Sequence, residues 1–236
     1  MRIVRPAAER GHVNAGWLDS RHTFSFGHYH DPRWMGFGPL RVINEDRVAP
    51  GGGFAPHRHA DMEILSYVIS GALAHRDSSG GTGVLRPGEV QWMSAGSGIE
   101  HSEYNGSDSE PVHFLQIWIM PGTAGLAPDY AQRAFDPALR EGRWATLASP
   151  DGVDGSLAIR QQASLRGTRL ARGVAVEQAL DPARRYWLHV VEGAVDVDGQ
   201  PLSAGDALGV TAESGALRLS GAGEGAAELL LFDLPQ

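Results

Sequence analysis

Pro56-His57-Arg58-His59 and, about forty residues later, Gly98-Ile99-Glu100-His101-Ser102-Glu103 are the stretches that decide how this chain folds. In each stretch, two side chains that can bind a metal stand two residues apart. Residues two apart on a β-strand point to the same face of the sheet. Two such strands, facing each other, would bring four ligands around one point: His57, His59, His101 and Glu103. Three imidazoles and a carboxylate suit a divalent transition metal with one position open for substrate.

The composition predicts a globular protein built from many short strands. The 236 residues include 31 Gly and 14 Pro, spread along the chain. This suits strands joined by tight turns better than long helices. The net charge of −8 argues against a nucleic-acid surface, which needs clustered basic residues. We therefore expect no direct contact with nucleic acid.

The residue types that are absent exclude several classes of site. There is no Cys, which excludes disulfides, thiolate metal ligands and cysteine nucleophiles. No apolar stretch has the length of a signal-peptide core or of a membrane span. The sequence thus predicts a soluble cytoplasmic protein that does not contact membranes, and we expect a monomer.

Alternating and β-branched residues predict strands along most of the chain. The predicted strands of the first half are 23–26, 40–44, 62–69, 72–77, 90–94 and 112–119. Residues 121–154 show the weakest strand pattern, and 130–135 are predicted to form one helical turn. From residue 155 the strand pattern returns and continues to residue 235.

The second half of the chain resembles the first. Residues 191–195 (Val-Glu-Gly-Ala-Val) match 69–73, and residues 202–206 (Leu-Ser-Ala-Gly-Asp) match 85–89, at offsets of 122 and 117. A duplicated barrel is therefore predicted. At the same offsets the four candidate ligands fall on Ala179, Asp181, Arg218 and Ser220. The second half would keep the scaffold without the site, which predicts one metal per chain.

These motifs resemble those of the cupin superfamily. Its first motif is a Gly, five residues, His-x-His, three or four residues and a Glu, and its second ends in Gly, two residues, His, three residues and Asn. The matching residues here are Gly51, His57, His59 and Glu63, then Gly98, His101 and Asn105. The usual Pro two residues before the second-motif Gly is replaced by Gly96. Together with His22-Thr23-Phe24-Ser25-Phe26 and the stretch 91–99, the motifs look like the pirin family, and especially its bacterial quercetin 2,3-dioxygenase-type members.

The resemblance implies an all-β bicupin, that is, two tandem cupin barrels of the double-stranded β-helix type. It implies an N-terminal metal-binding domain at 1–122, a linker at 123–154 and a degenerate cupin at 155–236. It also implies that His57, His59, His101 and Glu103 hold the metal. In many other cupins the carboxylate ligand is the first-motif Glu, here Glu63, which is the alternative. We expect His75, His113 and His189 to be hydrogen-bonded core residues, and His28 and His30 to lie in a loop.

The resemblance further implies a dioxygenase that opens the central ring of a flavonol such as quercetin with O₂ and releases CO. The cofactor would be one divalent ion of Fe, Ni, Cu, Co, Mn or Zn, and Glu103 would act as general base. The candidates for the walls of an aromatic pocket are Phe26, Phe54, Trp92, Met93 and Phe114. Two alternatives stay open: a metal-binding regulatory protein that acts through a protein partner, and a cupin oxygenase that acts on another polyphenol.

Overall fold

The computed structural model describes residues 1–236, which form strands and three short 3₁₀ helices but no α-helix. The predicted all-β class is therefore confirmed. Contacts within the chain define two compact units. The first consists of Gly11–Phe135 and Leu157–Gln161, and the second of Met1–Arg10, Asp136–Ser156 and Gln162–Gln236. Because these units interleave along the chain, the contiguous boundaries near residues 122 and 155 stay a prediction.

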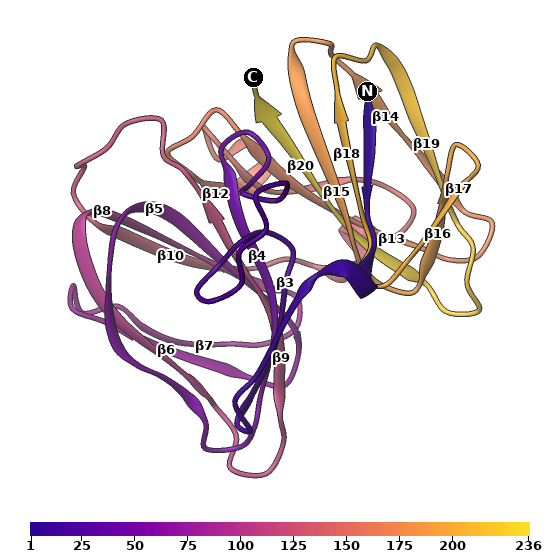
Figure 1. The fold of residues 1–236 in the computed structure, drawn as a ribbon. Helices are drawn as coiled ribbons and strands as arrows, with labels where there is room; N and C mark the ends of the chain where they lie inside the picture. The colour runs from indigo at the N-terminus through magenta and orange to yellow at the C-terminus, as the bar shows by residue number, and fades with distance from the viewer. The chain divides into compact units, whose positions relative to one another are not determined.

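The first unit is a sheet with the hydrogen-bonded order β2-β3-β4-β9-β5-β8-β6-β7, and β10 pairs with β8 (Figure 1). Its strands are β2 (Gly11–Asn14), β3 (Leu18–His22), β4 (Leu40–Val48), β5 (Gly53–Ser70), β6 (Leu73–Asp77), β7 (Thr82–Leu85), β8 (Glu89–Asn105), β9 (Val112–Ile119) and β10 (Asp129–Ala134). The short β12 (Leu157–Ala158) also belongs to this unit.

Strands β5 and β8 are 18 and 17 residues long and pair along most of their length. Two irregularities in their register, between Phe54 and His57 and between His59 and Asp61, bend the pair. Such bulges increase local twist and let a long sheet curve. Gly96 on β8, where the cupin motif usually has Pro, has a φ of 46°, and the Pro ring cannot adopt that angle. The positive φ of residue 96 therefore explains why glycine replaces the usual proline of the motif.

Two local predictions were wrong. Residues 23–26 do not form a strand: β3 ends at His22, and the chain turns so that Phe26 bridges to Tyr29. Residues 130–135 are not helical, since Asp129–Ala134 form strand β10 on the edge of β8. Pairing with β8 supplies backbone hydrogen bonds along the whole segment, which outweighs the local preference for a helical turn.

The second unit contains two sheets, one with the order β1-β18-β15-β20-β13-β11 and one with the order β14-β19-β16-β17. Its elements are β1 (Arg2–Arg5), η1 (Ala7–Glu9), η2 (Pro137–Arg140), β11 (Ala145–Ser149), η3 (Val153–Gly155), β13 (Ser164–Leu170), β14 (Ala175–Leu180), β15 (Arg184–Glu192), β16 (Ala194–Val197), β17 (Gln200–Ser203), β18 (Ala207–Thr211), β19 (Gly215–Gly221) and β20 (Ala227–Pro235). The N-terminal strand β1 pairs with β18, and Figure 1 shows it in indigo among orange and yellow strands.

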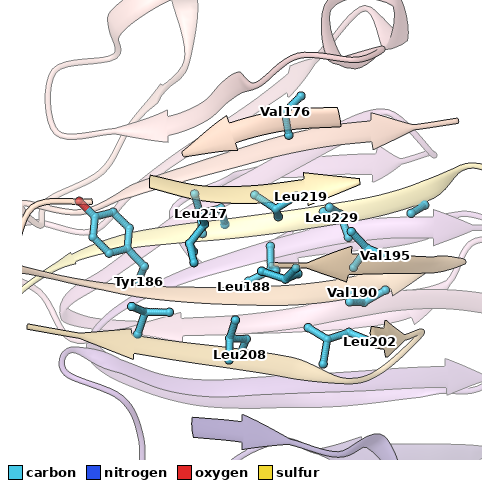
Figure 2. Close-up of a cluster of buried hydrophobic side chains, with 14 of the residues drawn as sticks. Val176, Tyr186, Leu188, Val190, Val195, Leu202, Leu208, Leu217, Leu219 and Leu229 are labelled. Atoms are coloured by element: carbon cyan, nitrogen blue, oxygen red, sulfur yellow. The ribbon is translucent and has the colours of Figure 1, made fainter. Parts of the chain in front are cut away.

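Aliphatic side chains fill the interior of the second unit. Figure 2 shows Leu188, Leu208 and Leu229, from β15, β18 and β20, in one buried cluster. Burial of this apolar surface is the main force that stabilises such a barrel. No helix in the chain has the length and apolar character needed to cross a membrane.

The two units use the same turns at matching positions. Gly71 before β6 has a φ of 79°, and Gly193 before β16 has a φ of 73°. A Cβ on Gly71 would lie 2.5 Å from the carbonyl oxygen of Pro111, and one on Gly193 would lie 2.7 Å from that of Ala226. Both positions therefore require glycine for the same reason, which supports the predicted duplication.

Gly193→Ala is expected to destabilise the protein more than Gly199→Ala, by about 1 to 3 kcal/mol, the usual cost of forcing a methyl group into a packed site. Both glycines have positive φ, at 73° and 87°, so the left-handed backbone destabilises the folded state of each alanine variant. Only at position 193 does the new methyl group also collide with backbone, whereas nothing lies within 4 Å of it at 199. Urea unfolding of both variants measures the difference, and equal losses would contradict this account of the turn.

Candidate metal centre

The antiparallel pairing of β5 with β8 brings three histidines together. His57 lies directly opposite His101, and Arg58 lies opposite Glu100. Because side chains alternate along a strand, His57, His59 and His101 share one face. Their ring centroids are 4.7 Å apart for His57 and His59, 4.5 Å for His57 and His101, and 4.8 Å for His59 and His101. One ring nitrogen from each lies within 4.8 Å of the others, so the three could hold a metal ion.

The surroundings of His57 and His101 leave ring nitrogens free to bind a metal ion. Nδ1 of His57 lies 2.8 Å from the carbonyl oxygen of Ala55, to which it donates. That bond fixes the tautomer and leaves the Nε2 lone pair of His57 for a metal. His101 is 2% exposed, and neither of its ring nitrogens has a hydrogen-bond partner. Buried polar atoms rarely lack partners, and metal coordination would satisfy one of these nitrogens.

Burial keeps two of the imidazoles neutral. Desolvation, assisted by the neighbouring histidines, lowers the pKa of His101 to about 3. Desolvation and His57 lower the pKa of His59 to about 4. Neutral imidazole is the form that binds metal, so neither ring has to lose a proton near neutral pH before it can coordinate.

Glu103 lies on the same strand as His101, two residues further on. Its carboxylate forms a second close group with His75 and His101, whose ligand atoms lie within 4.8 Å of one another. Nε2 of Gln116 donates to it at 2.6 Å, and the Ser66 hydroxyl donates at 3.3 Å. Complete burial raises the pKa of Glu103, and these hydrogen bonds oppose the shift. Coordination by Glu103 stays a prediction.

The alternative carboxylate, Glu63, is occupied elsewhere. It is fully buried and accepts hydrogen bonds from the Trp92 indole at 2.7 Å and from the Ser94 hydroxyl at 2.5 Å. The backbone N–H of Arg160 also donates to it, at 2.9 Å. Glu63 belongs to neither of the groups that could hold a metal, and it ties residue 160 to the first unit.

His75 and His113 are hydrogen-bonded and His28 and His30 lie in a loop, as expected from the sequence; His189 is 1% exposed, and its hydrogen bonding stays a prediction. His75 is buried, with Nε2 at 2.9 Å from Asp77 and Nδ1 at 3.3 Å from the Gln91 side chain. His113 contacts the Glu45 carboxylate at 2.9 Å. His28 and His30 are exposed, in the segment between β3 and β4, and belong to no metal-binding group.

A cavity of about 470 Å³ opens beside the histidines, within the size range of small-molecule sites. His57, His59 and Glu103 line it. Of the five predicted wall residues, Phe26 and Phe54 line the cavity, whereas Trp92, Met93 and Phe114 are buried elsewhere in the core. Sequence reasoning missed the remaining side chains that form its walls, which include Trp17, Asn44, Asp46, Gln116 and Trp118. For Gln116 a signal existed, because it is the one polar side chain in the apolar stretch 114–119.

Asp46 is an acidic group inside this cavity wall. It is 4% exposed and accepts a short hydrogen bond from the Ser20 hydroxyl. Desolvation raises its pKa to about 7, against the effect of Ser20, and the nearby carboxylates of Glu103 and Glu45 add to the rise. A carboxyl group held in this way can accept a hydrogen bond in either protonation state.

Comparison with known proteins places the chain among close relatives. The family model described as "Pirin" matches residues 3–119, and the one described as "Quercetinase C-terminal cupin domain" matches residues 146–234. The chain is 46% identical over 235 residues to "Quercetin 2,3-dioxygenase" of Escherichia coli (strain K12), which covers 100% of this chain and 99% of that protein. It is 42% identical over 212 residues to a "Pirin-like protein" of Caulobacter vibrioides, at 89% and 90% coverage.

Solved structures agree with the sequence comparison. Escherichia coli YhhW superposes with a TM-score of 0.94 at 46% identity, covering 100% of this chain and 98% of that one. A complex of bacterial pirin YhhW with nickel(II) gives 0.93 at 45% identity, with 100% and 99% coverage. Quercetin 2,3-dioxygenase from Acinetobacter baumannii, at 20% identity and a TM-score of 0.78, shares the fold. The predicted pair of cupin barrels is confirmed.

His57→Ala and His101→Ala are each expected to abolish metal binding with modest loss of stability, because each removes one of three converging nitrogens. His28→Ala, at an exposed histidine outside the group, is the matched control and should bind metal normally. Metal content after dialysis, measured by mass spectrometry, should be one ion per chain in the wild type. Full occupancy in both site variants would refute the assignment, and two ions per chain would contradict a degenerate second barrel.

The metal-free protein is expected to lose stability as the pH falls from about 6.5 towards 4. In that window the unfolded chain binds protons on His59 and His101, whereas the folded chain, with pKa values of about 4 and 3, does not. The free energy of unfolding therefore falls by up to about 1.4 kcal/mol per pH unit for each group, and is unaffected by them above 6.5.

Urea unfolding across this pH range, in the wild type and in His101→Gln, provides the measurement. The variant lacks one titrating ring, so its stability should depend less steeply on pH. Identical slopes in the two proteins would show that His101 is not held neutral by the fold.

Proposed function

The chain belongs to the pirin family of the cupin superfamily, and from this premise we propose that it is a metal-dependent dioxygenase of the quercetin 2,3-dioxygenase type. It opens the central ring of a flavonol with O₂ and releases CO. The observation that carries the proposal is the convergence of three imidazoles at the edge of an aromatic-lined cavity. That arrangement supports binding of a metal ion beside a flat aromatic substrate.

His57, His59 and His101 hold one divalent transition metal, with Glu103 as a fourth ligand. The structure of the bacterial pirin YhhW in complex with nickel(II) supports a bound metal ion. A bound divalent ion acts as a Lewis acid and lowers the pKa of a hydroxyl group coordinated to it. Most sites built from nitrogen and oxygen ligands bind divalent metals in the same order of affinity. The ion bound in the cell is therefore decided by site geometry and metal availability rather than by affinity alone.

Glu103 accepts the proton of the flavonol hydroxyl. Its raised pKa favours proton uptake, and the hydrogen bonds from Gln116 and Ser66 hold the carboxylate in one orientation. Gln116 is held beside it, since its amide oxygen lies 3.1 Å from the Ser66 hydroxyl, whose single proton is shared between Gln116 and Glu103. The base is therefore positioned before substrate arrives, which reduces the cost of orienting it during the reaction.

The aromatic walls hold the rings of the substrate and exclude water. Trp17 and Phe54 meet edge to face at 5.3 Å, and Phe26 meets Trp118 in the same way at the same distance. Trp118 also packs against His59, with ring centroids 4.7 Å apart. Aromatic walls of this kind favour a flat apolar ligand and leave its polar edge to the few polar side chains of the site. A cytoplasmic location, a monomeric state and the presence of a protein partner remain predictions.

Glu103→Gln is expected to lower the turnover of quercetin by about 10²- to 10⁴-fold, the usual contribution of a general base. The amide keeps the shape of the side chain but cannot take the proton. The measurement is loss of quercetin absorbance and formation of CO under air, after defined metals are restored to the apoprotein. Glu100→Gln is the matched control, since Glu100 is exposed on the same strand and pairs with Arg58 at 3.3 Å.

Metal-dependent CO release that Glu103→Gln loses and Glu100→Gln keeps would support both the reaction and the role of Glu103. Bound metal without turnover for every metal tried would refute the proposed reaction and favour the regulatory alternative. CO release at the wild-type rate in Glu103→Gln would refute the role of Glu103 alone.

A further inference from the structure

A row of polar side chains crosses the interior of the first barrel on neighbouring strands. Asn44 on β4 lies opposite Gln116 on β9, and Gln116 lies opposite Ser66 on β5. Gln116 and Ser66 direct their hydrogen bonds to each other and to Glu103. Asn44 takes no part in this network, although it occupies the adjacent position in the row.

Asn44 belongs to the cavity wall and carries an acceptor that has no partner. The residue is 3% exposed, lines the cavity, and its Oδ1 has no hydrogen-bond partner. The indole Nε1 of Trp118, on the neighbouring strand, is also buried without a partner and also belongs to a cavity residue. Leaving such groups unpaired is costly, so their occurrence together in one wall points to a ligand that pairs with them.

Asp46 adds a second acceptor to the same wall. It stands two residues from Asn44 on β4, so the two side chains share a face of the strand. Its carboxyl group lines the cavity, and its one hydrogen bond is to Ser20. The residues of this wall thus include an indole N–H and an amide oxygen that are buried without partners, and one carboxyl group, beside aromatic side chains.

We propose that Asn44, Asp46 and the indole N–H of Trp118 recognise a ring hydroxyl of the aromatic substrate, other than the hydroxyl that reaches the metal. A phenolic hydroxyl both donates and accepts, so it can pair with an amide oxygen or carboxylate and with an indole N–H. β4 lies two strands away from β5 in the sheet, so this wall and the metal ligands are on different strands around the cavity. The inference rests on the proposed function and specifies its substrate class as polyhydroxylated flavonols.

The test compares binding of quercetin with that of 3-hydroxyflavone, which keeps the metal-binding end and lacks the other hydroxyl groups. Dissociation constants are measured anaerobically on the nickel-loaded full chain, so that no turnover occurs. The deciding quantity is the ratio of the two constants. In Asn44→Leu this preference for quercetin should fall about threefold to tenfold, the effect of one neutral hydrogen bond. No internal hydrogen bond of the Asn44 Oδ1 atom is lost in this variant.

Phe26→Leu is the matched control, because it changes the same cavity without removing a polar atom. It should weaken both ligands and leave the ratio unchanged. Asn44→Ala serves as a second variant, and nickel content and unfolding midpoint verify that each protein is folded and loaded. An unchanged ratio in both Asn44 variants, or no preference in the wild type, would overturn the proposal. Selective binding without CO release would uphold it and refute the dioxygenase reaction instead.

Discussion

The antiparallel register between β5 and β8 is the constraint on which the metal centre depends. His57 is opposite His101, and the other candidate ligands follow by alternation along each strand. A shift of one residue in this register would turn His101 and Glu103 to the opposite face of the sheet. The bulges between Phe54 and His57 and between His59 and Asp61 bend the two strands, so their ends curve around the cavity.

The convergence of the three histidines was predictable from sequence because its geometry is local. His57 and His59, like His101 and Glu103, are related by strand alternation, and only the pairing of two strands had to be inferred. The cavity walls were not predictable to the same degree, since Trp17, in the bend between β2 and β3, and Trp118, on β9, lie far apart in the chain. The segments 23–26 and 130–135 were misassigned because turns and edge pairing, which depend on distant residues, determine their structure.

The interiors of the two barrels differ in polarity, and this difference affects how strongly each interior stabilises its fold. In the second unit, the interior is a continuous cluster of Leu and Val side chains. The interior of the first unit contains the buried polar residues Asn44, Gln116, Ser66 and Glu103, and buried polar groups stabilise a fold less than apolar ones unless they are fully paired. The second barrel, which retains glycine at the equivalent turn but not the ligands, can therefore be stable on packing alone.

Two buried glutamates in the first barrel differ in function because their surroundings differ. Glu63 accepts hydrogen bonds from Trp92, Ser94 and the backbone of residue 160, so its lone pairs are committed to holding the structure. Glu103 receives hydrogen bonds from Gln116 and Ser66, and burial raises its pKa against the opposing effects of these bonds and of the nearby histidines. A carboxylate whose lone pairs are filled by structural donors has little capacity left for a metal ion, whereas Glu103 receives fewer such hydrogen bonds. The placement of donors, more than the spacing within the motif, thus makes Glu103 the better candidate for chemistry.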